Sequence, residues 1–357
     1  MFLRNLLRAS AVIPFLYTTV TAQTACNNSP DLCSRSYSNI THLGAHDSPF
    51  LRNQETGFST SGNHFYNTTI QLDAGVRMLS AQVHKKNKSG TETLHLCHSS
   101  CTLLDAGTLR SWLEEIKAWM DRNTNDVVTV LLVNSDNASP SDLGAQFSAS
   151  GIDQLAYAPP DASTIPQAWP TLTTLIGNNT RLMTFVASLS TPATEFPYLM
   201  NQYAFMFENN FENTDPSNYS CDPSRPTNLG TPAAALQSNR MFLMNHFLYD
   251  DSLFGIQITN VTYANVTNAE TGLGSLGESL NNCTGVYGKP PSFVMVDWFN
   301  MGPAIASVDK ANEVTGAVGR TNMGTQALTQ GTSGVVRQRG SLLAVVVAVV
   351  GAVAFVS

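Results

Sequence analysis

Two histidines follow apolar segments of the sequence and are suited to share one reaction. His46 comes shortly after the apolar run 40–44, and His98 closes the segment TETLHLCH. A histidine side chain titrates near neutral pH, so one imidazole can accept a proton while a second donates one. The pair therefore predicts acid–base catalysis. The alternative is structural, with His46 bonded to backbone at a strand end and His98 held in a disulfide turn.

Short apolar runs recur along the chain and predict the strands that position these histidines. The run VVTVLLV at 127–133 is nearly all β-branched or aliphatic, which is typical of a strand buried on both faces of a parallel sheet. Alternating strands and helices over about 300 residues predict one α/β domain, a TIM-type (β/α)8 barrel. The predicted strands are 40–44, 76–83, 93–98, 127–133, 155–158, 181–186, 204–208, 241–247 and 293–298.

Active sites of such barrels lie at the carboxyl ends of the strands. The polar side chains at or near the predicted strand ends are His46, His98, Asn134, Glu208, His246 and Asp297. One helix is equally clear: Trp112, Ile116 and Trp119 recur at helical spacing after Thr108, which can serve as the N-cap.

The two ends of the chain resemble processing signals. Arg4 and Arg8 precede a short apolar stretch and the small-residue motif Val20-Thr21-Ala22, so residues 1–22 are expected to be a secretory signal peptide. Residues 341–357 are apolar, and 321–340 form a polar spacer. This order is typical of a signal for a glycosylphosphatidylinositol (GPI) anchor.

The expected lipidation residue is Gly331, with Asn322 and Ser333 as alternatives. The protein would then pass through the secretory pathway to the extracellular face of the plasma membrane or the cell wall. Its anchor would sit in the outer membrane leaflet.

Six cysteines, an even number, suit that oxidising route. Proximity in sequence predicts the disulfides Cys26–Cys33 and Cys97–Cys101 and leaves Cys221–Cys283, although six cysteines allow 15 pairings. A zinc site is the alternative, but no C-x2-C pair is present. Acceptor motifs for N-glycosylation are dense and predict a glycosylated surface. They lie at Asn27, Asn39, Asn67, Asn87, Asn137, Asn178, Asn218, Asn260, Asn265 and Asn282.

A net charge of −7 and the absence of a basic patch argue against a nucleic-acid partner. Lys85, Lys86 and Lys88 form the only notable basic cluster. It is either a solvated loop or a place where a phosphate is attracted.

The segments ITHLGAHDSPF, LDAGVRMLSAQV and LHLCHSS resemble the X region of the phosphatidylinositol-specific phospholipase C superfamily, in particular its secreted fungal phosphodiesterases. The resemblance is clearest over 36–135 and extends to about 305 by barrel layout, so residues 23–320 are expected to form the barrel. It implies that His46 is a general base that activates a hydroxyl beside the phosphodiester. His98 would be the general acid for the leaving oxygen, and a cyclic phosphodiester would form first.

The same resemblance gives two carboxylates supporting roles. Asp47 would orient or charge-stabilise the pair. Asp297 would bond His46 and fix its tautomer, or would be a structural carboxylate.

Three positions depart from the family pattern. Strand alternation places Ser80 and Gln82 on one face and Arg77 on the other. Family members carry acidic ligands, or an aspartate and an arginine, at Ser80 and Gln82, and calcium-dependent members carry another acid at Asn134. Calcium needs several hard oxygen ligands, so no calcium requirement and no other cofactor is expected.

The missing arginine must be replaced if the reaction is retained. Gln82, His84, Lys85 and His246 are candidates, and Asn134 and Asp297 are further expected substrate contacts. Two functions remain open. One is a metal-independent phosphodiesterase acting on a phospholipid or glycerophosphodiester. The other is a catalytically weakened barrel that binds a lipid head group or a glycan.

Overall fold

Eight parallel strands form the centre of the molecule. A computed structural model of the chain describes residues 24–329 apart from 89, 163, 190–192 and 254–255. All neighbours in the sheet pair in parallel along one path. In sheet order they are β7 (Leu199–Asn201), β6 (Leu182–Ala187), β5 (Val128–Asn134), β2 (Met78–Lys88), β1 (His42–Ala45), β12 (Phe293–Val296), β9 (Met241–Asn245) and β8 (Met206–Glu208).

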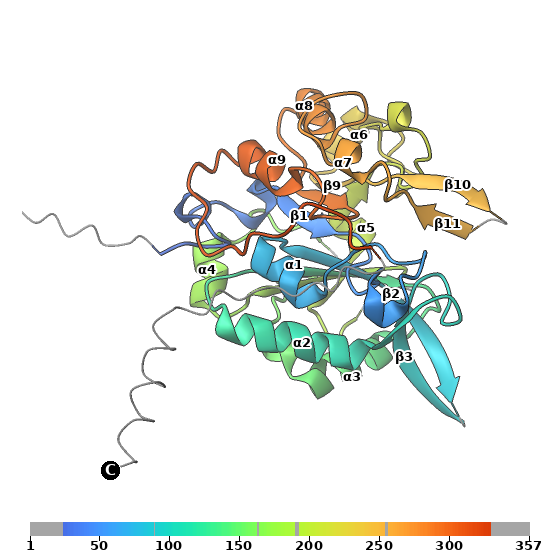
Figure 1. The fold of residues 1–357 in the computed structure, drawn as a ribbon. Helices are drawn as coiled ribbons and strands as arrows, with labels where there is room; N and C mark the ends of the chain where they lie inside the picture. The colour runs from blue at the N-terminus through green and yellow to red at the C-terminus, as the bar shows by residue number, and fades with distance from the viewer. Residues whose placement is uncertain (1–23, 89, 163, 190–192, 254–255, 330–357) are drawn as a thin grey trace, which may run out of the picture.

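The sheet curls into a barrel that remains open at one seam, so the predicted TIM-type architecture is confirmed with a distortion (Figure 1). The two edge strands, β7 and β8, are joined by the short helix α5 (Gln202–Phe205). Within the described residues no ladder pairs β7 with β8. The seam leaves one side of β8 free to pair with a loop.

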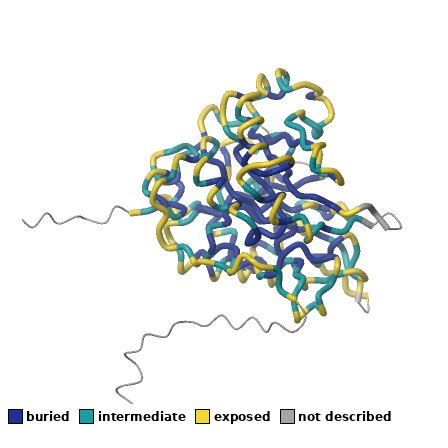
Figure 2. The backbone as a smooth tube through the Cα atoms, turned by 45° about the horizontal axis from the view of Figure 1, so that its top comes forward, coloured by how far each residue is buried: buried dark blue, intermediate teal, exposed yellow. Residues whose placement is uncertain are grey.

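Two apolar layers follow from strand alternation. One cluster of buried side chains fills the barrel and includes Met78, Leu131 and Leu243. A second cluster, which includes Leu79 and Val130, packs between the outer sheet face and the helices. Buried backbone accordingly runs through the middle of the molecule, and exposed backbone lies around it (Figure 2).

The helices cover the outside of the sheet. In α2, Thr108 is the N-cap, and its side chain accepts from the Ser111 backbone N–H, as predicted. Leu109, Trp112, Leu113, Ile116 and Trp119 form the buried face of α2. The helices are α1 (Thr68–Ala74), α2 (Leu109–Arg122), α3 (Pro140–Ser150), α4 (Leu172–Gly177), α6 (Pro232–Gln237), α7 (Ala264–Thr267), α8 (Leu276–Tyr287) and α9 (Ala304–Ala311). The 3₁₀ helices are η1 (Pro30–Leu32), η2 (Tyr37–Asn39), η3 (Gln54–Thr56), η4 (Ile152–Leu155) and η5 (Pro216–Asn218).

Two antiparallel hairpins project from the same side of the barrel (Figure 1). Strand β2 runs past the sheet and pairs with β3 (Thr91–Cys97), which in turn pairs with β4 (Asp105–Thr108). The second hairpin joins β10 (Tyr249–Leu253) to β11 (Ile256–Thr259). The predicted strand 93–98 is therefore a hairpin strand and not a barrel stave.

The prediction of a strand at 155–158 is wrong. This segment follows η4 and makes a single parallel bridge, from Ala156 to Leu182. Pro159 and Pro160 lack backbone N–H groups, so a ladder cannot continue through them. Strand β7 was not predicted because a three-residue strand carries too little pattern to be recognised.

The three predicted disulfides are confirmed. The Cα–Cα distances are 5.0 Å for Cys26–Cys33, 4.7 Å for Cys97–Cys101 and 5.3 Å for Cys221–Cys283.

The surface accommodates most of the predicted glycosylation sites. Nine of the ten acceptor asparagines are exposed or partly exposed. Asn27 is the exception, because it is 4% exposed and its side-chain oxygen accepts from the Val127 backbone N–H at 2.7 Å. A glycan at Asn27 is incompatible with this fold, so that expectation is wrong.

The predicted signal peptide, the lipidation residue Gly331 and the apolar tail lie outside the described residues. Within the described part, no helix combines the length and apolar character needed to cross a bilayer.

Candidate active site

His46 stands at the carboxyl end of β1 and is held by a buried carboxylate. Its backbone N–H donates to the Val296 carbonyl, which continues the ladder with β12. Its Nδ1 lies 3.0 Å from Asp297 Oδ1. A carboxylate only accepts, so Nδ1 carries a hydrogen and Nε2 is the nitrogen left to exchange a proton. The expected contact between His46 and Asp297 is therefore present.

Two neighbours fix this arrangement further. Asn63 is fully buried, and its Nδ2 donates to Asp297 Oδ1 at 2.9 Å. The ring of Phe247 lies parallel to the His46 ring, with centroids 3.8 Å apart. The carboxylate fixes the tautomer of His46, and the phenyl ring fixes its plane.

Asp47 lies between the two histidines. Its Oδ2 is 3.7 Å from His46 Nε2 and 3.6 Å from His98 Nε2. Asp47 adopts a left-handed backbone conformation, with φ of 53°. Its backbone N–H donates to Ser80 Oγ at 2.8 Å, and Gln82 Nε2 donates to Oδ2 at 2.7 Å. One carboxylate oxygen thus faces both imidazoles, which the sequence could not establish.

His98 reaches this point because the β2–β3 hairpin folds back to the barrel. Its backbone N–H donates to the Leu104 carbonyl at 2.9 Å, and the adjacent Cys97 is bonded to Cys101. Ser99 donates its backbone N–H to Gln82 Oε1 at 2.9 Å. Gln82 therefore links the loop that carries His98 to Asp47.

The two histidines have opposite pKa shifts. Burial acts to lower the pKa of His46, but the charges of Asp47 and Asp297 outweigh it and place that pKa above 6.5. Burial lowers the pKa of His98, and the charge of Asp47 offsets this only in part. In the free protein a proton therefore favours His46 over His98. Such a separation defines a proton donor and a proton acceptor.

Four other predicted site residues are not brought into this cluster. His84 pairs with Asp136 at 3.2 Å, and Lys85 lies 3.7 Å from Glu92 on the hairpin. The side-chain amide of Asn134 is used by its own loop: Nδ2 donates to the Ala138 carbonyl, and Oδ1 accepts from the Ala138 backbone N–H.

His246 points out of the barrel. It is fully buried, its Nε2 lies 2.9 Å from the Thr267 carbonyl, and burial lowers its pKa to about 4. Its neighbour Phe247 takes the inward face because side chains alternate along an extended chain.

The face assignment of β2 is confirmed. Ser80 and Gln82 both contact Asp47, whereas Leu79 packs in the outer apolar layer. Arg77 bonds Asp126 through Nε and Nη2 and does not join the cluster. Asn63 and Phe247 were missed. Asn63 lies in no recognisable sequence motif. The alternation of faces along the predicted strand 241–247 would have indicated that Phe247 faces the inside of the barrel.

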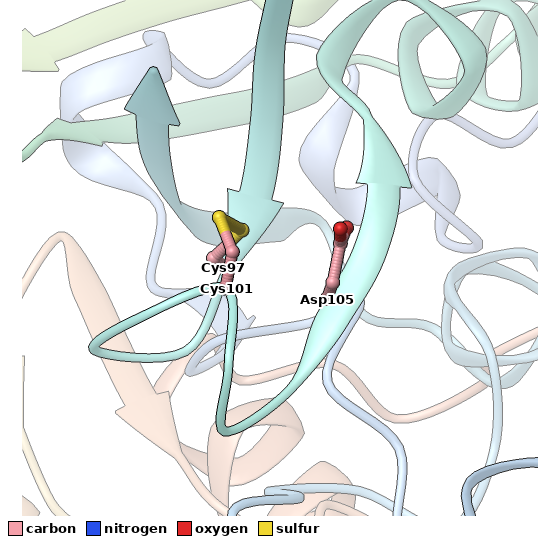
Figure 3. Close-up of side chains that lie close together, drawn as sticks. All are labelled: Cys97, Cys101 and Asp105. Carbon is pink, nitrogen blue, oxygen red and sulfur yellow. A yellow bond between two sulfur atoms is a disulfide. The ribbon is translucent and has the colours of Figure 1, made fainter. Parts of the chain in front are cut away.

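The residues present do not fit a metal site. Within the described residues, one group has ligand atoms close enough to hold an ion, namely Cys97, Cys101 and Asp105. Its two sulfur atoms are bonded to each other, as Figure 3 shows, and Asp105 holds Lys86 Nζ at 2.6 Å. At the histidine pair, Gln82 presents N–H groups to Asp47, and the Asn134 oxygen is used by its own loop. Oxygen ligands therefore do not converge as calcium requires.

Comparison with known proteins now identifies the family. The family model described as PI-PLC X 1 matches residues 32–312. The chain belongs to this PI-PLC X domain family.

Two curated relatives come from one fungus. A PI-PLC X domain-containing protein 1 of Arthroderma benhamiae is 35% identical over 281 residues, which cover 78% of this chain and 87% of the relative. An uncharacterized secreted protein of the same fungus is 37% identical over 297 residues, or 81% of this chain. The present chain spans 64% of that second relative.

Solved structures support the fold. A phosphatidylinositol-specific phospholipase C of Staphylococcus aureus superposes with a TM-score of 0.53 and 12% identity, covering 78% of this chain and 94% of the bacterial one. A second structure of the S. aureus enzyme gives a TM-score of 0.51, with 12% identity over 78% of this chain and 94% of that one. At 12% sequence identity, the structural similarity supports the barrel fold and says nothing about the activity of this chain.

Proposed function

We propose that this protein is a phosphoric diester hydrolase or lyase that uses two histidines, needs no metal ion, and acts on a phospholipid or glycerophosphodiester at the cell surface. Membership of the PI-PLC X family supports phospholipase C-like phosphodiesterase chemistry. The observation that carries the proposal is that Asp47 Oδ2 lies within 3.7 Å of Nε2 of both histidines.

The first half of the reaction forms a cyclic diester. His46 Nε2 takes the proton of a hydroxyl next to the phosphodiester, and the hydroxyl oxygen bonds phosphorus as the bond to the leaving oxygen breaks. His98 gives its proton to that oxygen. Asp297 stabilises the imidazolium that forms on His46, at 3.0 Å from its Nδ1.

The second half reverses the roles. His98 takes a proton from water, the water oxygen bonds phosphorus, the ring P–O bond opens, and His46 protonates the released oxygen. The opposite pKa shifts favour this starting state, with His46 protonated and His98 neutral. The first half starts from the less populated protonation state of the free protein, so substrate binding must favour that state or the step is slow.

Cell-surface location remains part of the proposal. The curated fungal relative described as secreted supports the secretory route. Nine exposed or partly exposed glycosylation motifs and three disulfides are compatible with it. The GPI anchor at Gly331 and the outer-leaflet partner rest on the terminal sequence patterns.

Phosphorus NMR tests the activity directly. The secreted protein is incubated with phosphatidylinositol and with simpler glycerophosphodiesters, with and without a chelator, between about pH 4 and pH 9. We expect a cyclic phosphate that forms in chelator and falls by at least about 10²-fold in His46→Ala and in His98→Ala. His95→Ala is the control, because His95 bonds Asp105 on the hairpin. Absence of turnover for every diester, or full activity of His46→Ala, refutes the proposal.

One observation favours the alternative of a binding protein. The Gln82 amide is already bonded to Asp47 and to Ser99, and it supplies no charge to a phosphorane. In that case the wild type turns over no diester. Binding of phosphatidylinositol vesicles would then survive in the His46→Ala/His98→Ala double variant.

A further inference from the structure

A cavity of about 480 Å³ lies at the amino end of the barrel, between the segment that leads into β1 and the helices α8 and α9. Thr41 lines this cavity and is the residue before β1, whereas His46 follows the carboxyl end of the same strand. The cavity is therefore separate from the candidate active site. Its volume falls within the range of about 300–1,000 Å³ that small-ligand sites occupy.

The wall of this cavity contains a predicted acceptor for an N-linked glycan. Asn39 lines the cavity, is exposed, and begins the acceptor motif Asn39-Ile40-Thr41. In this respect it differs from Asn27, whose side chain is buried and bonded to the backbone. A glycan attached to Asn39 would therefore start at the edge of the cavity.

The backbone on both sides of Asn39 is fixed against the cavity. Asn312, the C-cap of α9, accepts from the Thr41 backbone N–H at 2.8 Å and donates to the Thr41 carbonyl at 2.7 Å. Ser292 donates its hydroxyl to the Ser38 carbonyl at 3.1 Å. A glycan on backbone held in this way has few positions open to its first sugar, which lowers the entropic cost of binding that sugar.

The lining of the cavity combines apolar surface with uncharged polar groups. Ile40 and Leu280 are buried and supply apolar walls. Ser307 also lines the cavity, is 5% exposed, and its Oγ has no hydrogen-bond partner among the residues that the structure describes. Buried polar atoms are ordinarily hydrogen-bonded, so this hydroxyl is left available to a polar group that enters the cavity.

The charged residues of the lining cancel and favour a neutral ligand. Two cations, Arg35 and Lys310, are matched by two acids, Glu270 and Glu313. Lys310 pairs with Glu270 at 2.6 Å. The first sugar of an N-linked glycan, N-acetylglucosamine, is uncharged. Its hydroxyl and acetamide groups both donate and accept hydrogen bonds, and its methyl group and ring faces are apolar. These properties match the lining.

We propose that the cavity binds the first sugar of a glycan carried by Asn39, so that the glycan forms part of the folded structure at this end of the barrel. The ligand is a neutral N-acetylhexosamine attached to the chain itself. In the secretory pathway an oligosaccharide is transferred from a lipid diphosphate. The bond from Asn39 Nδ2 to the sugar C1 forms, the C1–O bond to the diphosphate breaks, and Nδ2 loses one proton.

This proposal rests on the secretory route proposed above and is independent of the phosphodiesterase chemistry. Its test uses the full chain secreted from a fungal host that attaches high-mannose glycans. The native protein is treated with an endoglycosidase that cleaves between the first two sugars, and glycopeptide mass spectrometry follows each acceptor with time.

We expect cleavage at Asn39 to be at least about tenfold slower than at the control acceptors, because the sugar must first leave the cavity. The controls are Asn178, the exposed C-cap of α4, and Asn265, which is exposed on α7. In denatured protein the difference should disappear.

A pair of variants tests whether the cavity is responsible. Asn281 lines the cavity from α8 and is exposed. Asn281→Trp fills the space, so we expect cleavage at Asn39 to reach the rate of the control acceptors with glycan occupancy unchanged. Asn281→Ala is the matched control, since it leaves the space open and should keep the protection. Circular dichroism melts confirm that both variants fold, and the wild-type comparison is decisive if one does not.

Three results overturn the proposal. They are an unmodified Asn39 in a protein glycosylated at other acceptors, equal cleavage at Asn39 and at the controls in the wild type, and protection that persists in a folded Asn281→Trp variant. A chain without any glycan would refute the secretory route as well. A protected glycan on a protein that turns over no diester would refute the phosphodiesterase and support the glycan site.

Discussion

At the scale of single residues, two imidazoles share the carboxylate of Asp47 yet differ in environment. Nε2 of both histidines lies within 3.7 Å of Asp47 Oδ2, but His46 alone is bonded to Asp297. That second carboxylate helps raise the pKa of His46, whereas burial dominates at His98. The assignment of donor and acceptor therefore depends on Asp297 as much as on the histidines.

Asp297→Asn tests this dependence. The neutral amide no longer favours the imidazolium, so we expect the pKa of His46 to fall. The acid limb of the pH–rate profile, which reports deprotonation of His46, then moves to lower pH. We expect kcat to fall by about 10²-fold or more because the tautomer is no longer fixed. Histidine NMR titration measures the pKa, with surface Asp121→Asn as control; an unmoved His46 titration contradicts the prediction.

At the scale of elements, a hairpin and a short disulfide bring His98 to the barrel. Strand β3 is not one of the parallel barrel strands. It runs antiparallel to β2, so that its last residue, Cys97, lies near the carboxyl ends of the barrel strands. The Cys97–Cys101 bond closes a loop with a sequence separation of only 4 residues. This small ring limits the positions that the adjacent His98 can take.

Removal of that disulfide is expected to affect activity more than stability. Closing so short a loop stabilises a fold by about 2 kcal/mol. Cys97→Ala/Cys101→Ala should lose that amount of unfolding free energy, and kcat should fall by about tenfold or more because His98 is less well placed. Cys26→Ala/Cys33→Ala is the control, with a sequence separation of 7 and no contact with the histidine pair. Equal loss of kcat in both variants would show that His98 does not depend on its loop.

At the scale of the whole molecule, the barrel buries three histidines besides the proposed catalytic pair. His42, His64 and His246 are at most 2% exposed, and burial lowers the pKa of each to about 4. In the unfolded chain these side chains titrate near 6.5. Between those values the unfolded state binds more protons, so folding stability present above about pH 6.5 is lost as the pH falls toward 4.

Chemical unfolding at several pH values measures this loss. Each of the three histidines contributes at most about 1.4 kcal/mol per pH unit within that window. His246→Gln can still donate to the Thr267 carbonyl and has no proton to gain, so its stability should decline less steeply below about pH 6.5. A slope identical to that of the wild type would contradict the prediction.

Features that depend on a local pattern of residues could be predicted from the sequence. Four such features lie within short segments. They are the helical spacing of apolar residues in α2, the apolar run of β5, the alternation that puts Ser80 and Gln82 on one face, and the two close cysteine pairs. The histidines at strand ends were recognisable for the same reason. Predictions failed where proline or short length removed the pattern, at 155–158 and β7.

How these features combine depends on contacts between segments that are far apart in the sequence. Asp297 meets His46 from 251 positions away, and Asn63 meets Asp297 across 234. The backbone of Arg225 pairs with Glu208 because the barrel is open beside β8, and His246 turns away because Phe247 takes the inner face. Such contacts arise from sheet closure and strand register, which no single segment encodes. The sequence therefore determined which residues can carry the chemistry, and packing of the barrel decided which of them meet.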